Sequence, residues 1–434
     1  MRHLCTVILA VLLISSILVA GSRNTSVGTK TATSVIDGRI LQKTETASEQ
    51  NHHPPAQNMF ELEKSLPIPN SGLYMSNVRW QSTAGAAIGQ DVAVNPNGTN
   101  AFIGWNLNSE RVSFHDNSSG TPLWEYSSDP ETYRNFVALS ATANIVANAS
   151  YHNIYLFDKN SGSVTFNFPI PSSRIAGPIA VSRDGQLLVC ATSSPLAGGM
   201  HRVYAFSPPS TTPIWTFDFS DAQSTGIYGI NISVDKSTVA VNGKFYGWFL
   251  NATNGTVRTE VEIANTESRL ALSANASVLA IAELSGFIKA YTYSVAQSRY
   301  NLLWQYRIPP GLFTNWASSI DVSADGLTIM AGSLIFVSSS ETDGAAYMFD
   351  TFGEGTPNWI FSGMGDLVDE IAISDDGSLL AAVTWGDLAN LKADIYIFER
   401  NSNTPVFSVN TPGSMFSLSM SADGKSVAAG GKAV

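Results

Sequence analysis

The stretch Asp321-Val-Ser-Ala-Asp-Gly-Leu-Thr-Ile-Met-Ala-Gly332 decides the fold of this chain, because versions of it recur along most of the sequence. Its first half alternates apolar and polar residues, as a strand with one buried face does. Asp325-Gly326 supplies the positive φ of a tight hairpin turn, and an apolar strand follows it. The stretch therefore predicts a β-hairpin, and its recurrence predicts stacked copies of one supersecondary unit.

About eight copies of this hairpin follow one another at intervals of roughly forty to fifty residues, the spacing expected of propeller blades. They begin at Val92, Val137, Ile179, Ile230, Leu270, Ile320, Ile371 and Leu418. Between them lie half-units made of an aromatic strand, a polar turn and a strand bearing Trp or Phe, as in Ala346-Tyr-Met-Phe followed by Pro357-Asn-Trp359. A hairpin and a half-unit together give the four antiparallel strands of one blade.

The two ends of the repeat region predict how the ring closes. The last hairpin, residues 418–431, has no outer strands after it, whereas residues 72–75 and 78–82 look like outer strands with no hairpin before them. Joined, they would complete one blade and remove the free edges of an open sheet. We therefore expect an all-β, eight-bladed β-propeller, closed by N-terminal outer strands that join a C-terminal inner hairpin. Seven blades is the alternative, if a weak copy such as residues 137–147 forms no blade of its own.

The repeats resemble the blades of WD40-like and quinoprotein-like (PQQ-repeat) β-propellers. The Ser-x-Asp-Gly turn is similar to the first group, and outer strands such as Leu156-Phe-Asp-Lys-Asn-Ser-Gly162 are similar to the second. This resemblance covers residues 72–434 and implies the fold, which hosts many unrelated functions. A quinoprotein alcohol dehydrogenase would be expected to hold its quinone with an adjacent cysteine pair and a calcium ion. Since Cys190 stands alone after removal of a leader, we expect no cofactor.

The N-terminal part of the chain predicts its destination. Arg2 and His3 precede an apolar run that ends near Ala20, which is typical of a secretory signal peptide over residues 1–22. Residues 23–68 are polar, show no sustained apolar period and predict a disordered linker. The propeller would then occupy residues 69–434. We expect a secreted, extracellular or envelope protein with no membrane insertion after signal cleavage.

Charge and composition exclude some partners. The net charge of −11 argues against nucleic acid and anionic membrane surfaces, which a diffuse negative field does not attract. Charged residues make up only 14% of the chain, and Ser, Thr and Asn supply much of the polarity. Glycosylation sequons of the Asn-x-Ser/Thr type suit exposed loops of a secreted protein. The candidates are Asn97, Asn117, Asn148, Asn251 and Asn254, and further sequons begin at Asn24, Asn231 and Asn275.

No catalytic set or metal triad stands out, since the histidines at 115, 152 and 201 are scattered. In a propeller, the connections from one blade to the next share a face with the loops that join the second and third strands, and ligands commonly use that face. The candidate binding residues there are Tyr133, Arg134, Tyr228, Arg269, Phe313, Trp316, Asp366, Asp369, Glu370, Trp385 and Asp387. An aromatic and charged rim of this kind suits a protein or a glycan.

Two classes of function remain open. The absence of a catalytic set favours a secreted binding or scaffold protein with an unknown protein or glycan ligand. The alternative is a secreted propeller enzyme: a quinoprotein-like oxidoreductase, a lactonase or a glycan hydrolase. Three or more acids converging on an axial pocket would favour the enzyme, and a flat aromatic face would favour the binding protein.

Overall fold

The structure, a computed structural model, describes residues 30–36, 39–45, 78–82, 87–106, 110–127, 135–194, 199–220, 226–263, 267–311 and 313–433. It divides into two units, Met1–Tyr74 and Met75–Val434. In the first unit, β1 (Lys30–Ile36) pairs antiparallel with β2 (Arg39–Glu45). The polar sequence of residues 23–68 did not predict this hairpin. Among the described residues, no helix is long and apolar enough to cross a membrane.

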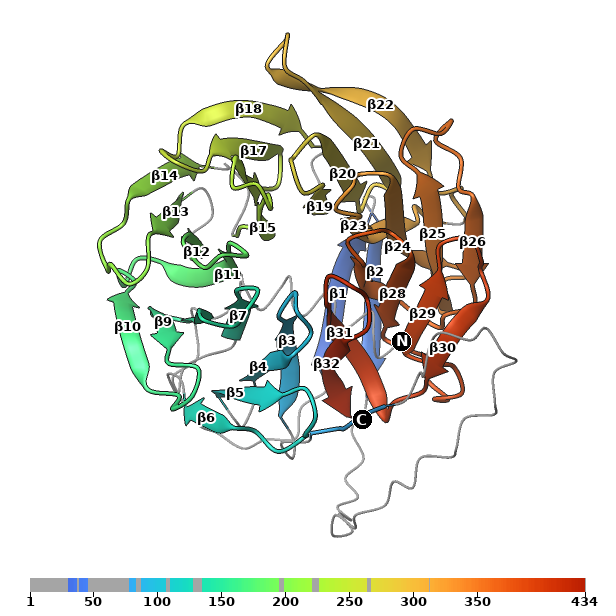
Figure 1. Ribbon diagram of the computed structural model, residues 1–434. Coiled ribbons are helices and arrows are strands. Elements are labelled where there is room, and N and C mark those ends of the chain that lie inside the picture. Colours follow the sequence, from blue (N-terminus) through green and yellow to red (C-terminus); the bar gives the residue numbers. More distant parts are fainter. Residues whose placement is uncertain are drawn as a thin grey trace. The chain divides into compact units, whose positions relative to one another are not determined.

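The second unit contains seven four-stranded antiparallel sheets, arranged as the blades of a ring (Figure 1). In each sheet four consecutive strands pair in chain order, from the innermost strand to the outermost. The first four sheets are β3 (Ile88–Val94), β4 (Asn100–Asn106), β5 (Arg111–Asp116), β6 (Trp124–Ser127); β7 (Asn135–Leu139), β8 (Val146–Ser150), β9 (Asn153–Phe157), β10 (Val164–Pro169); β11 (Ile175–Val181), β12 (Leu188–Ser193), β13 (Met200–Phe206), β14 (Trp215–Ser220); and β15 (Gly229–Ile232), β16 (Thr238–Asn242), β17 (Tyr246–Asn251), β18 (Val257–Glu262). The other three are β19 (Ser268–Leu272), β20 (Val278–Glu283), β21 (Phe287–Ser294), β22 (Arg299–Arg307); β23 (Trp316–Val322), β24 (Thr328–Phe336), β25 (Thr342–Asp350), β26 (Trp359–Ser362); and β27 (Val368–Ile373), β28 (Leu379–Thr384), β29 (Ile395–Glu399), β30 (Pro405–Val409).

A two-stranded sheet, β31 (Gly413–Met420) with β32 (Val427–Ala433), lies between the seventh sheet and the first. Seven is therefore the number of complete blades in the described part of the chain, which is the alternative count. The expected eighth blade is represented by β31 and β32 alone. The weak copy at Val137 does form a full sheet, so the incomplete blade lies at the ends of the repeat region. Residues 78–82, expected to be an outer strand, form none.

Tryptophans near the outer edge fasten four of the sheets to the sheet that follows. The indole Nε1 of Trp124 donates to the carbonyl of Lys159 at 2.8 Å, and Gly162 lies so close to the ring that a Cβ there would be 2.6 Å from it. The same bond runs from Trp215 to Ala252, from Trp304 to Thr351 and from Trp359 to Arg400. Trp80 donates likewise to Asn117 at 3.2 Å. Although residues 78–82 form no strand, Trp80 makes toward the first sheet the contact that outer-strand tryptophans make elsewhere.

The recurring hairpin turn owes its shape to its Ser, Asp and Gly. Ser323 Oγ donates to Asp325 Oδ1 at 2.5 Å and accepts from the Thr328 N–H at 3.0 Å, while Gly326 has a φ of 75°. Left-handed backbone is strained for residues with a Cβ, which explains the glycine. In copies that lack it, Ala143, Lys236 and Ala276 take the same place at φ values of 53°, 54° and 54°.

Backbone hydrogen bonds link many of these turns to the turn of the next sheet. An N–H of one turn donates to a carbonyl of the next. The bonds run from Asp235 to Ala274, from Ala274 to Ala324, from Ala324 to Asp375, from Asp375 to Ala422 and from Ala422 to Pro96, with lengths of 2.8 to 3.1 Å. The last of these joins the two-stranded sheet to the first sheet.

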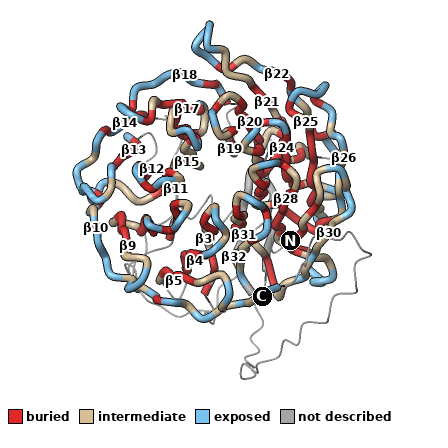
Figure 2. Tube along the Cα trace, in the orientation of Figure 1, coloured by how far each residue is buried: buried red, intermediate tan, exposed pale blue. Residues whose placement is uncertain are grey.

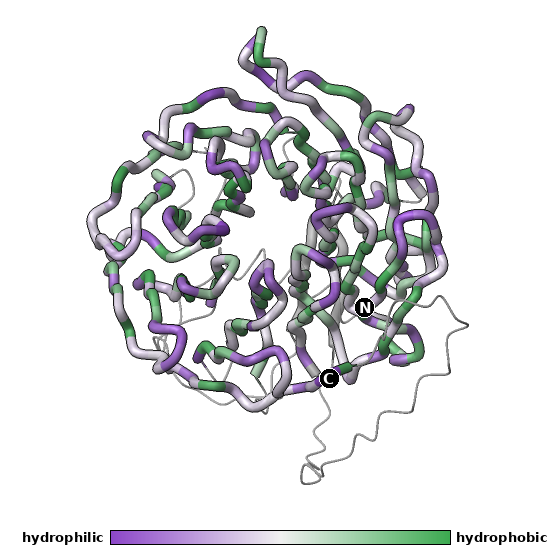
Figure 3. Tube along the Cα trace, viewed as in Figure 1, coloured by the Kyte–Doolittle hydropathy of each residue, from purple (hydrophilic) through white to green (hydrophobic). Residues whose placement is uncertain are grey.

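The core lies between neighbouring sheets rather than in one central mass. Second strands such as β12 and β28 are buried along their whole length, because a neighbouring sheet packs on each face (Figure 2). Outermost strands such as β18 expose most of their residues. Figure 3 shows hydrophobic and hydrophilic residues alternating along these outer strands, as one-sided burial requires.

Candidate functional site

The connections between strands define two faces of the ring. The loop face carries the second-to-third-strand loops and the connections between sheets, which meet where Met364 N–H donates to Gly344 and Trp385 N–H donates to Leu367. The turn face carries the hairpin turns and the third-to-fourth-strand turns, which meet where Thr351 N–H donates to Leu327. Those predicted binding residues that the structure describes belong to the loop face and to the strand ends beside it.

The structure brings most of the predicted residues together on the fifth, sixth and seventh sheets. Tyr133 and Arg134 lie outside the described residues. Tyr228 is half-buried between the third and fourth sheets, where its N–H donates to the Asn242 carbonyl at 2.8 Å, away from the others. The remaining eight fall into three groups: Arg269, Asp369, Glu370 and Trp385; Phe313 and Trp316; and Asp366 and Asp387.

Asp369 is held by two of the other predicted residues. Trp385 Nε1 donates to its Oδ2 at 2.8 Å. Burial raises the pKa of Asp369 to about 6, against the opposing effects of the Trp385 hydrogen bond and the positive charge of Arg269. Arg269 lies on β19 and Asp369 on β27, two sheets apart, so the attraction reflects the convergence of innermost strands on the ring axis.

Glu370 and Asp91 form a pair of neighbouring acids, and Ser417 lies between them. Glu370 Oε2 accepts from the Leu418 N–H at 2.6 Å, and Ser417 Oγ donates to Asp91 Oδ1 at 3.4 Å. Burial, followed by the negative charge of Asp91, raises the pKa of Glu370 to about 8. Burial also raises the pKa of Asp91 to about 6. A β-bulge in β27 and another in β3 end at these residues, and bulges re-aim side chains in this way.

Three acids share one structural role. Asp91 Oδ2 accepts from the Val137 N–H at 2.8 Å, as Glu370 does from Leu418. Asp321 Oδ2 accepts from the Ile373 N–H at 2.8 Å, and burial raises the pKa of Asp321 to about 7. Each acid therefore clasps the innermost strand of the following sheet. We call Asp91, Asp321 and Glu370 the strand-clasp acids.

The sequence analysis missed two of the strand-clasp acids, Asp91 and Asp321. For Asp321 the available signal was an acid at a position of the repeated first strand where most copies carry a small residue, as in Ile320-Asp-Val beside Ile179-Ala-Val; Asp91 lies one residue before its copy, as Glu370 does. Among the described residues, no three His, Cys, Asp or Glu side chains are arranged to hold a metal ion.

An apolar patch forms the second group. Phe313 and Trp316 pack edge-on against Phe336, with ring centroids 5.8 Å and 5.4 Å apart. Phe336 is the last residue of β24, and Val337, which begins the loop after it, is 55% exposed. On the neighbouring loop of the seventh sheet, Leu388 and Leu391 are 68% and 82% exposed. We call Phe313, Trp316, Phe336, Val337, Leu388 and Leu391 the apolar loop patch; only Phe313 and Trp316 were predicted.

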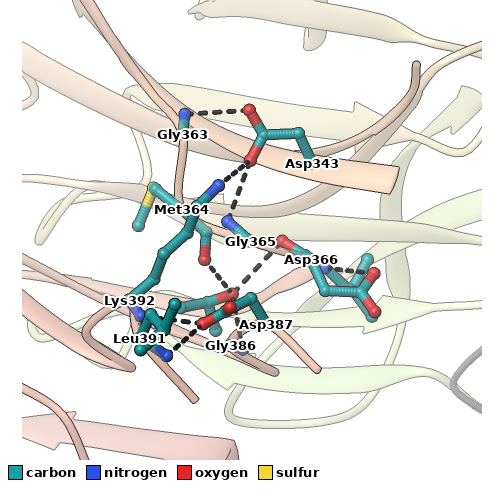
Figure 4. A network of polar contacts seen from close by, with 11 residues as sticks. Asp343, Gly363, Met364, Gly365, Asp366, Gly386, Asp387, Leu391 and Lys392 are labelled. Carbon is teal, nitrogen blue, oxygen red and sulfur yellow. Dashed lines mark hydrogen bonds and ion pairs between the residues drawn. The ribbon is translucent and has the colours of Figure 1, made fainter. Parts of the chain in front are cut away.

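A polar network holds these loops in place (Figure 4). Asp343 accepts from the N–H groups of Gly363 and Gly365 at 2.9 and 2.8 Å. Lys392 Nζ donates to Asp343 Oδ1 at 3.4 Å, which ties the loop bearing Leu391 to the strand beside Phe336. The network thus links the two halves of the apolar loop patch.

The predicted Asp366 and Asp387 belong to this network as structural groups. Asp387 Oδ1 accepts from the N–H groups of Leu391 and Lys392 at 2.8 and 2.7 Å. Asp366 is buried, and its Oδ1 accepts from the Leu367 N–H at 2.8 Å (Figure 4). Both carboxylates stabilise loop backbone.

The structure buries one of the predicted glycosylation sites. Asn148 is fully buried in β8, and its Nδ2 donates to Asn135 Oδ1 at 3.2 Å and to the Phe136 carbonyl at 3.1 Å. A glycan replaces one of the two hydrogens of that nitrogen, so it would remove one of these bonds, and the fully buried side chain leaves no room for it within the sheet. The sequon arises because a central strand happens to read Asn-Ala-Ser.

Comparisons with known proteins agree with the repeat pattern. A family model described as outer membrane protein assembly factor BamB, of the PQQ-like type, matches residues 108–360. The solved β-propeller domain of Cps50 (Swd1) from Myceliophteria thermophila matches with a TM-score of 0.51 and 13% identity, over 69% of this chain and 93% of that chain. At this identity the likeness shows the fold alone. A search of curated proteins found no match. The expected WD40-like and PQQ-repeat propeller architecture is confirmed.

Proposed function

The chain belongs to the family described as outer membrane protein assembly factor BamB, and from that premise we propose that it is a secreted scaffold that binds a protein partner at the cell surface or in the envelope. The family name denotes an assembly factor, and the proposal gives this chain a role of that non-catalytic kind. Support for secretion comes from the charged start and apolar run of residues 1–22.

The observation that carries the proposal is the apolar loop patch. Val337, Leu388 and Leu391 expose most of their surface on loops of the sixth and seventh sheets that the Lys392–Asp343 contact connects, and exposed apolar surface gathered on one face marks an interaction site. The loop that bears Leu391 is fixed at its backbone, because Asp387 Oδ1 accepts from the N–H groups of Leu391 and Lys392. A rigid surface loses little conformational entropy on binding. Exposed aliphatic side chains suit apolar residues of a protein better than a sugar ring, so the partner proposed is a protein.

The described residues do not fit a quinone cofactor of the alcohol dehydrogenase type. Cys190 is buried in β12, and no second cysteine is adjacent to it in the sequence. Burial raises the pKa of its thiol to about 12. The calcium ion of such enzymes would need a cluster of acids, which the described residues do not form. The proposed function therefore includes no step at a quinone.

An enzyme is the second candidate, because Asp369 and Glu370 are carboxyls with raised pKa beside the ring axis. Such groups are suited to proton transfer near neutral pH. The clasp bond of Glu370 to Leu418 favours a structural role instead. Turnover of a polysaccharide or lactone that is lost in both Asp369→Asn and Glu370→Gln would establish the enzyme.

The binding proposal is tested by site-specific photo-crosslinking in the producing cells. A photoreactive residue replaces Leu388 or Leu391 on the loop face, or Leu327 on the turn face, which is 44% exposed and serves as the matched control. One discrete protein adduct is expected from positions 388 and 391 and none from position 327. Equal labelling from both faces, or no adduct from the loop face, would contradict the proposal.

A further inference from the structure

The sequons of the propeller fall into two classes, according to whether the Asn side chain donates a hydrogen bond through Nδ2. Asn117, Asn148 and Asn231 donate through Nδ2. Asn117 bonds to the Gly98 carbonyl at 2.6 Å and to Ser426 Oγ at 2.8 Å, and Asn231 bonds to the Leu270 carbonyl at 3.1 Å. An N-linked glycan replaces one of the two hydrogens of Nδ2, so attachment at Asn117 or Asn148 would remove one of their two bonds, and attachment at the half-buried Asn231 would crowd its bond to Leu270 on the next sheet.

The other sequons keep Nδ2 out of their hydrogen bonds. Asn254 Oδ1 accepts from the N–H and Oγ1 of Thr256 at 3.0 and 2.7 Å. Asn275 Oδ1 accepts from the Ser277 N–H at 3.0 Å and from Ser273 Oγ at 3.1 Å. Both side chains are exposed, and so is Asn97. In these three residues a sugar could join Nδ2 without the loss of any bond described here.

All three accessible sequons lie on the turn face. Asn97 and Asn275 occupy the hairpin turns between β3 and β4 and between β19 and β20. Asn254 lies in the turn between β17 and β18, which packs on a hairpin turn where Ala252 N–H donates to Ser237. The sequence places no sequon in any connection of the loop face. Asn251, also on the turn face, is half-buried and ends β17, immediately before the turn that contains Asn254.

We propose that the protein is glycosylated on one face: oligosaccharides at Asn97, Asn254 and Asn275 cover the turn face and leave the loop face bare. The inference rests on the proposed function for a secretory route. In the reaction, Asn Nδ2 forms a bond to the anomeric carbon of a lipid-linked oligosaccharide. The bond from that carbon to the lipid phosphate breaks, the lipid phosphate leaves with the electron pair, and Nδ2 loses one proton.

Such one-sided modification would orient the molecule. Glycans are bulky and strongly hydrated, so they would prevent close protein contact over the turn face. The apolar loop patch, on the opposite face, would then be the surface available to a partner. The arrangement deepens the proposed function, because it determines which face can bind.

The test uses the full chain in a glycosylating secretory host, with its own leader in one arm and a host leader in the other. Peptide mass mapping after glycosidase release reports each Asn. Glycans are expected at Asn97, Asn254 and Asn275, with Asn117, Asn148 and Asn231 unmodified. Thr256→Ala and Ser277→Ala, which keep the Asn, should each remove the mass of one glycan. Equal modification of the two classes, or none at the exposed three in the host-leader arm, would overturn the inference.

The two proposals fail separately. If only the host leader gives export, the proposed location fails while the glycan pattern is still measured. Val337→Asn creates an Asn-Ser-Ser acceptor within the apolar loop patch. Its glycan is expected to abolish photo-crosslinking from Leu388, and Val337→Gln, which creates no acceptor, should retain it. Unchanged crosslinking in glycosylated Val337→Asn would show that the bare face is not the binding face.

Discussion

Arg183 donates two hydrogen bonds to the carboxylate of Asp375, from Nη1 to Oδ2 at 2.6 Å and from Nη2 to Oδ1 at 2.5 Å, although they belong to the third and the seventh sheets. With β31 and β32 in the eighth place, these sheets stand opposite each other in the ring. The pair therefore spans the turn-face mouth of the axial space.

Removal of this pair should have a small and salt-sensitive effect. The side chains of Arg183 and Asp375 are 36% and 34% exposed, so solvent screens them. A double-mutant cycle with Arg183→Ala and Asp375→Ala should give a coupling of about 0.2–1 kcal/mol that declines with added salt. Denaturant unfolding of the four proteins measures it. Additive single effects would mean that the pair contributes no net stability.

The stability of the propeller should fall as pH rises from about 4 to 8. Burial raises the folded-state pKa of Asp91 to about 6, of Asp321 to about 7 and of Glu370 to about 8. The folded state therefore binds protons more tightly than the unfolded chain, whose carboxyls titrate near their ordinary values of 3.8 and 4.5. The resulting stabilisation is complete below those values and is lost as pH rises through 6 to 8.

The opposite sign applies to Asp184 on the turn face. Burial opposes the shift, but hydrogen bonds from Lys236 and Ser182 lower the pKa of Asp184 to about 2. Its stabilisation is present above the ordinary value of 3.8 and is lost as pH falls toward 2. Melting temperatures measured from pH 3 to 8 should thus peak near pH 4 to 5. Glu370→Gln should flatten the alkaline limb, and an unchanged slope in this variant would refute the assignment.

Gly326→Ala should destabilise the propeller by about 1–2 kcal/mol, the cost of a left-handed residue with a Cβ. The φ of Gly326 is 75°, and an added Cβ would be 2.9 Å from Val278 Cγ2 on the preceding sheet. The matched control is Ala276→Gly at the equivalent turn position, where φ is already 54°. This change should cause no comparable loss. Chemical denaturation compares the two, and a neutral Gly326→Ala would show that the turn adjusts freely.

Trp304→Phe should weaken the junction between the fifth and sixth sheets. The Trp304 indole donates to the Thr351 carbonyl at 2.7 Å and stacks on Phe349 with centroids 5.0 Å apart. Loss of the donor leaves a buried carbonyl without this partner, at a cost of about 1–3 kcal/mol. Trp316→Phe, at a half-buried loop-face position, is the control and should shift the melting temperature less. Equal shifts would indicate general loss of aromatic volume.

The repeated hairpin made the fold predictable, whereas the chain ends did not fully follow the pattern. Ser323, Asp325 and Gly326 use their side chains and backbone locally, so the sequence reveals the turn directly. Closure of the ring depends on which distant segments pair. Residues 78–82 kept the tryptophan contact expected of an outer strand but not the strand itself. The described residues therefore form seven complete blades, the alternative to the eight that were expected.

The candidate site was less predictable, because its members meet only in three dimensions. Arg269 and Asp369 interact across two sheets, and the predicted face was enough to find them. Asp91 and Asp321 were missed because each looked like an ordinary polar residue on an alternating strand, and only the packing of neighbouring innermost strands makes them half-buried clasps. Asn148 was accepted as a sequon because its motif contains no information about burial.

The junction at β31 and β32 has a mechanical consequence. Elsewhere the ring consists of whole four-stranded blades, but at this joint β31 and β32 alone meet the first sheet, through bonds such as Val92 N–H to Ser417 Oγ and Val94 N–H to Ser419 Oγ. Under a pulling force between Met75 and the last strand, β31 and β32 should peel away first and at low load, with the seven blades still stacked. A partner that binds both the first sheet and the sheet of β31 and β32 would stabilise this joint against a pulling force.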